Sequence, residues 1–111
     1  MVALEEYRER VQQLLEKYQT PQFLKGGVET QLIVDTKHDH YQLVNVGWDN
    51  GQRVYICVIH IDIKDDKVWL QQNLTDQLVA EDLVELGVPN DHIVLGFQPI
   101  YMRKHTGFAA N

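Results

Sequence analysis

The sequence contains a single cysteine, Cys57, among its 111 residues. One cysteine cannot form a disulfide within the chain, so the pattern that marks small secreted domains is missing and we expect a cytoplasmic protein. Acidic Glu5 and Glu6 stand near the N-terminus, where a secretory signal needs basic residues. No run of about 18 apolar residues occurs, so the sequence predicts no membrane span.

Positive charge is also scarce. Ten Lys and Arg residues stand against 16 Asp and Glu residues, which gives a formal net charge of −6. Because proteins bind the nucleic-acid backbone by placing cations against it, this balance disfavours direct nucleic-acid binding. Arg103, Lys104 and His105 form a short basic exception, for which a solvated chain end is the simpler interpretation.

The glycine-rich and nucleophile motifs of common enzymes are missing. The sequence has no Gly-x-Ser-x-Gly elbow, no Gly-x-Gly-x-x-Gly turn and no phosphate-binding Gly-x-x-x-x-Gly-Lys loop. Cys57 stands between Ile56 and Val58 in an apolar run, where ionisation of a thiol is suppressed. We therefore predict no catalytic residues, no cofactor and no enzymatic activity.

What the chain does have is the composition of one ordinary globular domain. Hydrophobic residues make up 44% of it and charged residues 23%. A chain of this length buries roughly two thirds of the surface of its unfolded form, which is enough for one core. The sequence predicts a single domain over residues 1–111.

Two segments have the periodicity of helices. Residues 2–18 place apolar side chains every three or four positions, before Pro21 ends the pattern: Leu4, Tyr7, Val11, Leu14, Leu15 and Tyr18. This stripe suits packing on a sheet, and a homodimer is a second use for it. A second helix is predicted over residues 76–86, with Thr75 as its N-cap and Gly87 after its end.

Four segments between these helices are rich in β-branched and aromatic residues and predict strands: 31–35, 40–48, 53–63 and 68–72. A polar turn precedes each of the last three segments. One of these turns, Asp49-Asn50-Gly51, is a strong hairpin signal. Every connection is too short for a parallel crossover. The prediction is an α+β fold, a four-stranded antiparallel meander packed against the two helices, with residues 53–63 as a central strand covered on much of both faces.

Two other segments are less regular. Lys25-Gly26-Gly27 is predicted to be a flexible connection. The pattern of residues 88–111 does not fix their conformation.

Histidines and an aspartate cluster in the predicted sheet. His60 and Asp62 lie two residues apart on one strand, and His40 lies one strand earlier, so the three could bind a metal or exchange protons. His60 is expected to share its face with Ile56 and Val58, however, and no third ligand follows at a diagnostic spacing. We therefore favour a hydrogen-bonded structural histidine and predict no metal.

Aromatic and basic side chains supply the candidate contacts for a partner. Tryptophan and tyrosine are common in binding hot spots, although they also form ordinary cross-strand pairs in a core. Residues 101–108 mix aromatic, basic and flexible residues, which suits either a docking segment or a disordered terminus. The candidate contacts are Tyr41, Trp48, Trp69, Arg103, Lys104 and Phe108.

Several strings, in order along nearly the whole chain, resemble the XisI family. They are Asp39-His40-Tyr41-Gln42-Leu43-Val44, Val46-Gly47-Trp48, His60-Ile61-Asp62-Ile63, Lys67-Val68-Trp69-Leu70-Gln71, Leu83-Val84-Glu85-Leu86-Gly87-Val88-Pro89, Asp91-His92-Ile93-Val94-Leu95-Gly96-Phe97, and Arg103 with Thr106-Gly107-Phe108-Ala109. The family comprises the cyanobacterial fdxN element excision controlling factor and its relatives.

The resemblance implies an accessory role in excision of a DNA element by a separate site-specific recombinase during heterocyst development. The chain would act by binding a XisH-like partner protein. Three alternatives stay open: an antitoxin-like neutraliser of a nuclease-like partner, a metal-assisted hydrolase built on His40, His60 and Asp62, and a direct DNA-binding protein.

Overall fold

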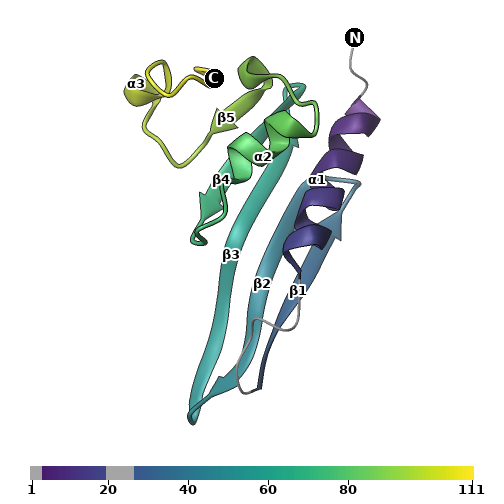
Figure 1. The fold of residues 1–111 in the computed structure, drawn as a ribbon, viewed down its shortest axis with the longest axis vertical. Helices are drawn as coiled ribbons and strands as arrows, with labels where there is room; N and C mark the ends of the chain where they lie inside the picture. The colour runs from purple at the N-terminus through teal and green to yellow at the C-terminus, as the bar shows by residue number, and fades with distance from the viewer. Residues whose placement is uncertain (1–3, 20–26) are drawn as a thin grey trace.

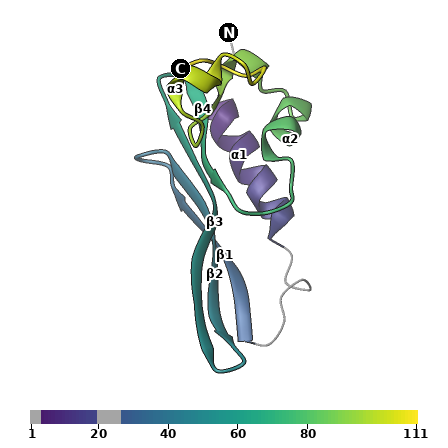
Figure 2. The ribbon, with the colours of Figure 1, turned by 90° about the vertical axis from the view of Figure 1, so that its left-hand side faces the viewer.

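A computed structural model of the protein describes residues 4–19 and 27–111. It contains a five-stranded sheet in the order β1-β2-β3-β4-β5, with helices α1 and α2 on one face (Figure 1, Figure 2). The elements are α1 (Leu4–Tyr18), β1 (Gly27–Asp35), β2 (His40–Asp49), β3 (Gln52–Lys64), β4 (Lys67–Asn73), α2 (Val79–Glu85), the 3-10 helix η2 (Asn90–His92), β5 (Ile93–Leu95) and α3 (Ile100–Arg103).

The first four strands form the predicted antiparallel meander, and the α+β class is confirmed. The β2–β3 hairpin turns at Asn50 and Gly51, whose φ angles are 50° and 77°. The β3–β4 hairpin turns at Asp65 and Asp66, also with positive φ. Two consecutive residues of positive φ give a turn whose twist matches that of the flanking strands, which explains these tight reversals.

The sheet has one strand more than predicted. β5 pairs in parallel with β4, with Val94 opposite Trp69, and α2 forms the crossover between the two strands. A further bridge joins Val94 to Ala109, so the C-terminal residues return to the sheet edge. A three-residue apolar strand cannot be distinguished from a helix or loop by periodicity, which is why residues 88–111 had no predicted conformation.

The second helix starts later than predicted, at Val79 rather than at residue 76. Thr75 does not cap it: the Thr75 N–H and hydroxyl donate to Asn73 Oδ1, and the Thr75 hydroxyl accepts from the N–H of Gln77. These bonds form a separate turn before the helix. In α1 the predicted start at Val2 lies outside the described residues, as do Lys25 and Gly26, whereas Gly27 begins β1 instead of belonging to a flexible connection.

The core lies between the sheet and helices α1 and α2. Alternate residues of the strands point into it, including Tyr41, Leu43, Ile59, Ile61, Ile63, Val68 and Leu70. The opposite side of the sheet, which we call the open face, is not covered by these helices (Figure 2). β3 is therefore central but not covered on both faces as predicted, and Tyr55 is 71% exposed where the β2–β3 hairpin extends past the helices as an arm (Figure 1).

Two β-bulges change which residues share a face. The pairing of β2 with β3 passes from Leu43↔Ile59 to Val44↔Cys57, so Val58 is an extra residue. The pairing of β3 with β4 contains a second shift, in which Gln71 is the extra residue. A bulge reverses the alternation beyond it, and His60 consequently lies on the face opposite to that of Val58, contrary to prediction.

Candidate functional site

Tyr41 does not lie on the surface. Its ring is completely buried in the core, and its hydroxyl donates to Asp39 Oδ1 at 2.9 Å. Arg8 donates to both carboxylate oxygens of Asp39, at 2.7 and 3.1 Å. Burial first, and then the bond to Asp39, raises the pKa of Tyr41, while the Arg8 guanidinium holds the pKa of Asp39 below its usual value. Tyr41 is a structural residue, and the prediction that it contacts a partner is wrong.

Trp69 and Arg103 come together at one end of the open face. The Arg103 guanidinium carbon lies 5.4 Å from the Trp69 ring centroid, and Lys64 Nζ lies 4.2 Å from the same centroid. Arg103 Nε also donates to the carbonyl of Gln98 at 3.0 Å. Cation–π contacts of this kind stabilise exposed segments modestly. Arg103 therefore holds the C-terminal segment against β4.

Next to Arg103 in the sequence, four apolar side chains are exposed to solvent on and around α3, which Figure 1 shows beside β5. We call them the C-terminal patch: Phe97 (50% exposed), Ile100 (73%), Tyr101 (72%) and Met102 (40%). Clustered exposed apolar side chains are typical of a binding surface. The sequence indicated residues 101–108 as a docking segment but missed Phe97 and Ile100, the apolar residues on either side of Gln98-Pro99.

The remaining candidate contacts lie elsewhere. Trp48 is 56% exposed on the arm, where the Arg53 guanidinium carbon lies 5.6 Å from its ring centroid. Lys104 is exposed directly after α3, and Phe108 is half-buried against the core. The six predicted residues thus do not form one surface, although Trp69, Arg103 and Lys104 belong to the same end of the molecule.

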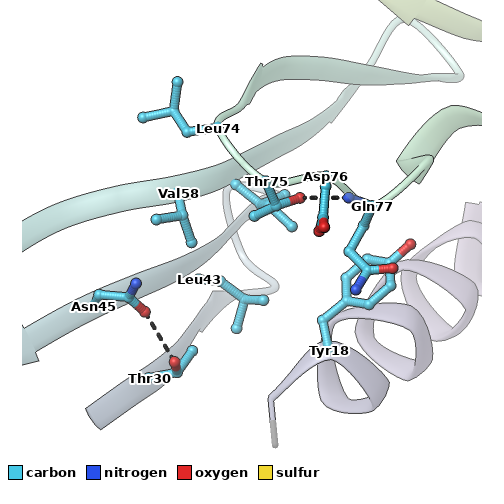
Figure 3. A pocket seen from close by; sticks show the side chains of 10 residues that line it. Tyr18, Thr30, Leu43, Asn45, Val58, Leu74, Thr75, Asp76 and Gln77 are labelled. Atoms are coloured by element: carbon cyan, nitrogen blue, oxygen red, sulfur yellow. Dashed lines mark hydrogen bonds between the residues drawn. The ribbon is translucent and has the colours of Figure 1, made fainter. Parts of the chain in front are cut away.

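A cavity of about 490 Å³ lies where the helix layer ends and the arm begins (Figure 3). The hydroxyl of Thr30 donates to Asn45 Oδ1 across it, and the Thr75 hydroxyl accepts from Gln77. Its polar groups are mostly neutral hydroxyls and amides, with one carboxylate, that of Asp76. The lining residues are Tyr18, Thr30, Leu43, Asn45, Val58, Ile59, Leu74, Thr75, Asp76 and Gln77.

Cys57 is half-buried in β3. Partial burial raises the pKa of its thiol, so the reactive thiolate is disfavoured. In the described part of the chain, no helix is both long and apolar enough to cross a membrane.

The histidines and aspartate singled out from the sequence converge on the open face, and we call them the His–Asp cluster (His40, His60 and Asp62). His40 and Asp62 are direct partners in the β2–β3 pairing, and His60 lies two residues before Asp62. Asp62 Oδ1 is 2.7 Å from His40 Nδ1 and 2.8 Å from His60 Nε2. One potential ligand atom from each residue lies within 4.8 Å of the others.

Two glutamines complete the surroundings of the His–Asp cluster. Gln71, the bulged residue of β4, donates to Asp62 Oδ2 at 3.1 Å, and Gln42 Nε2 lies 3.3 Å from His60 Nδ1. Gln71 could not be identified from the sequence, because its position depends on the bulge.

Within the His–Asp cluster, Asp62 and His40 shift each other's pKa toward the charged form. Partial burial would raise the pKa of Asp62, but hydrogen bonds from His40 and His60 outweigh it and the pKa is lowered. The bond to Asp62 in turn raises the pKa of His40. The cluster can therefore hold a proton or a cation beside an ionised carboxylate.

Comparison with known proteins gives a consistent match along the chain. The model of one protein family, described as XisI protein, matches residues 1–110. A solved structure of a XisI-like protein from Anabaena variabilis ATCC 29413 is 51% identical and superimposes with a TM-score of 0.90, covering 96% of this chain and 98% of the other. A comparison with curated protein sequences gave no match.

A second solved structure from the same organism is the fdxN element excision controlling factor XisI. It is 29% identical and has a TM-score of 0.83, over 97% of this chain and 98% of the other. The similarity in both cases spans the helices, the sheet and the C-terminal segment.

Proposed function

The chain belongs to the XisI family, and from this we propose that it acts as an accessory factor that controls excision of a DNA element by a separate recombinase. A related structure of the same fold is an fdxN element excision controlling factor. The chain acts by binding a XisH-like partner protein, and it neither forms nor breaks DNA bonds itself.

The charge of the chain supports an indirect action. With a net charge of −6, the protein gains little from the phosphate backbone, because binding there depends on cations that displace counterions. Among the described residues, no threonine or cysteine side chain is hydrogen-bonded to a histidine or carboxylate that could act as its base. An effect on DNA excision is then best exerted through another protein.

The C-terminal patch is the observation that carries the proposal. Its exposed apolar side chains lie next to Arg103, which is stacked on Trp69. Tyrosine, tryptophan and arginine dominate binding hot spots, because each combines a large apolar contact area with polar groups. We propose this patch as the surface that the partner covers.

The test is association of the purified chain with a XisH-like protein from the same genome, measured by isothermal titration calorimetry. Tyr101→Ser should weaken binding at least about tenfold, or about 1.4 kcal/mol. Tyr55→Ser is the matched control, since Tyr55 has nearly the same exposure, 71% against 72%, but lies on the arm. If Tyr101→Ser binds with wild-type affinity, the C-terminal patch is not the binding surface. If the wild-type chain does not bind, the XisH-like protein is not its partner.

A further inference from the structure

We propose that the His–Asp cluster is a binding site for one divalent transition-metal ion such as Zn²⁺. The site is distinct from the C-terminal patch and does not depend on the proposed excision role. The preference for a structural histidine rested on His60 facing Ile56 and Val58. The bulge at Val58 removes that argument, because it places His60 on the open face beside Asp62.

The donor atoms are already close to the required spacing. Zn²⁺ binds imidazole nitrogen and carboxylate oxygen at about 2.0–2.2 Å, so ligands in a tetrahedral site lie about 3.4 Å apart. The donor atoms of His40, His60 and Asp62 all lie within 4.8 Å of one another. Small side-chain rotations suffice to bring three donors to a common ion. Paired strands hold the three Cα positions, since His40 is registered directly against Asp62.

Two neighbouring amides support the ligands from behind. Gln71 donates to Asp62 Oδ2, which orients the carboxylate so that Oδ1 faces the two imidazoles. Gln42 lies against His60 Nδ1. When His60 Nε2 binds a metal, its Nδ1 carries the proton, and rotation of the Gln42 amide presents an oxygen to accept it. Such partners fix the orientation of ligating histidines and carboxylates.

The donor set selects the class of ion. Two imidazoles and one carboxylate suit Zn²⁺, Co²⁺ or Ni²⁺, whereas Mg²⁺ and Ca²⁺ prefer oxygen ligands. Three protein ligands leave at least one coordination position for water or for a side chain of another molecule. The His40 side chain is 55% exposed, so this position is accessible from the open face. When His40 Nδ1 and His60 Nε2 bind the ion, the proton of each neutral imidazole is carried by its other ring nitrogen.

The experiment is titration of the full chain, stripped with a chelator and desalted, with ZnCl₂ at neutral pH by isothermal titration calorimetry. We expect one ion per chain. Asp62→Asn and His40→Ala should each lower the affinity at least about tenfold, in line with losses on removing groups that merely orient ligands. His105→Ala is the matched control, because His105 is an exposed histidine after α3 and should leave the affinity unchanged.

Circular dichroism establishes that each variant is folded before titration. A second readout uses the two tryptophans with Co²⁺, which quenches nearby fluorescence. Trp69 is registered against Asp62, whereas Trp48 lies on the arm, so Trp48→Phe should keep the quenching and Trp69→Phe should lose it. Absence of stoichiometric binding, or equal affinities for wild type and folded Asp62→Asn, would overturn the proposal.

Discussion

Replacement of Tyr41 separates a structural role from a role in partner binding. The ring is completely buried beside other core residues of β2, and its hydroxyl is bonded to Asp39. Truncation of a large buried aromatic side chain costs about 3–5 kcal/mol. Tyr41→Ala should therefore remove a large part of a domain stability that is typically about 5–15 kcal/mol.

Tyr41→Phe removes only the hydroxyl. A hydrogen bond to a charged group contributes about 1.5–3 kcal/mol, and Arg8 still holds Asp39 in the variant, so we expect a loss near the lower end of that range. Tyr55→Phe, at 71% exposure, is the control and should change stability by less than about 0.5 kcal/mol.

Urea unfolding followed by circular dichroism measures these differences, provided that the dependence of the free energy on urea is unchanged. Partner binding is then measured for the folded Tyr41→Phe protein, and it should equal that of the wild type. A Tyr41→Ala protein of normal stability that no longer binds the partner would refute the assignment of Tyr41 to the core.

Two further predictions concern Gly47 of β2 and the Arg8–Asp39 pair. In urea unfolding, Gly47→Ala should destabilise the protein by about 1–3 kcal/mol more than Gly51→Ala. A Cβ at Gly47 would lie 1.9 Å from the Gly27 carbonyl oxygen, whereas a Cβ at Gly51, which also has a positive φ, meets nothing within 4 Å. Equal losses of stability would contradict this reason. The pKa of Asp39 is lowered in the folded state by Arg8, so its stabilisation is complete above the ordinary aspartate pKa of about 4 and is lost as the pH falls through the lower folded value. The stability difference between wild type and Arg8→Gln should therefore be full at pH 7 and shrink in acid, and a difference that grows below pH 4 would show that another group is responsible.

The sequence was sufficient where local chemistry decides the structure. Asn50-Gly51 favours positive φ at two successive positions and correctly predicted the β2–β3 hairpin. The apolar spacing of α1 correctly predicted its buried stripe, including Tyr7, Val11 and Leu14. The burial of Tyr41 was also accessible, because Tyr41 alternates with His40 along β2, although it was instead assigned to an aromatic surface.

Features that depend on tertiary pairing were not accessible. β5 is only three residues long and is specified by its pairing with β4 and by the return of Ala109 to Val94. The bulges at Val58 and Gln71 follow from how neighbouring strands pack rather than from a residue that favours them. They decide which side chains surround Asp62, so the composition of the His–Asp cluster could be predicted but not its geometry.

Side chains of β3 alternate between the core and the open face, so residues of the open face can be substituted without altering the core. Ile61 points into the core, while its neighbours His60 and Asp62 point to the open face. Because each paired strand places successive side chains on opposite faces, a change at Asp62 removes no core contact. Among residues 4–19 and 27–111, no buried side-chain polar atom lacks a hydrogen-bond partner, and Asp62 is satisfied by His40, His60 and Gln71 on the open face. The His–Asp cluster thus lies outside the apolar core, and the bulged Gln71 orients its carboxylate toward the two imidazoles, as a ligand-binding site requires.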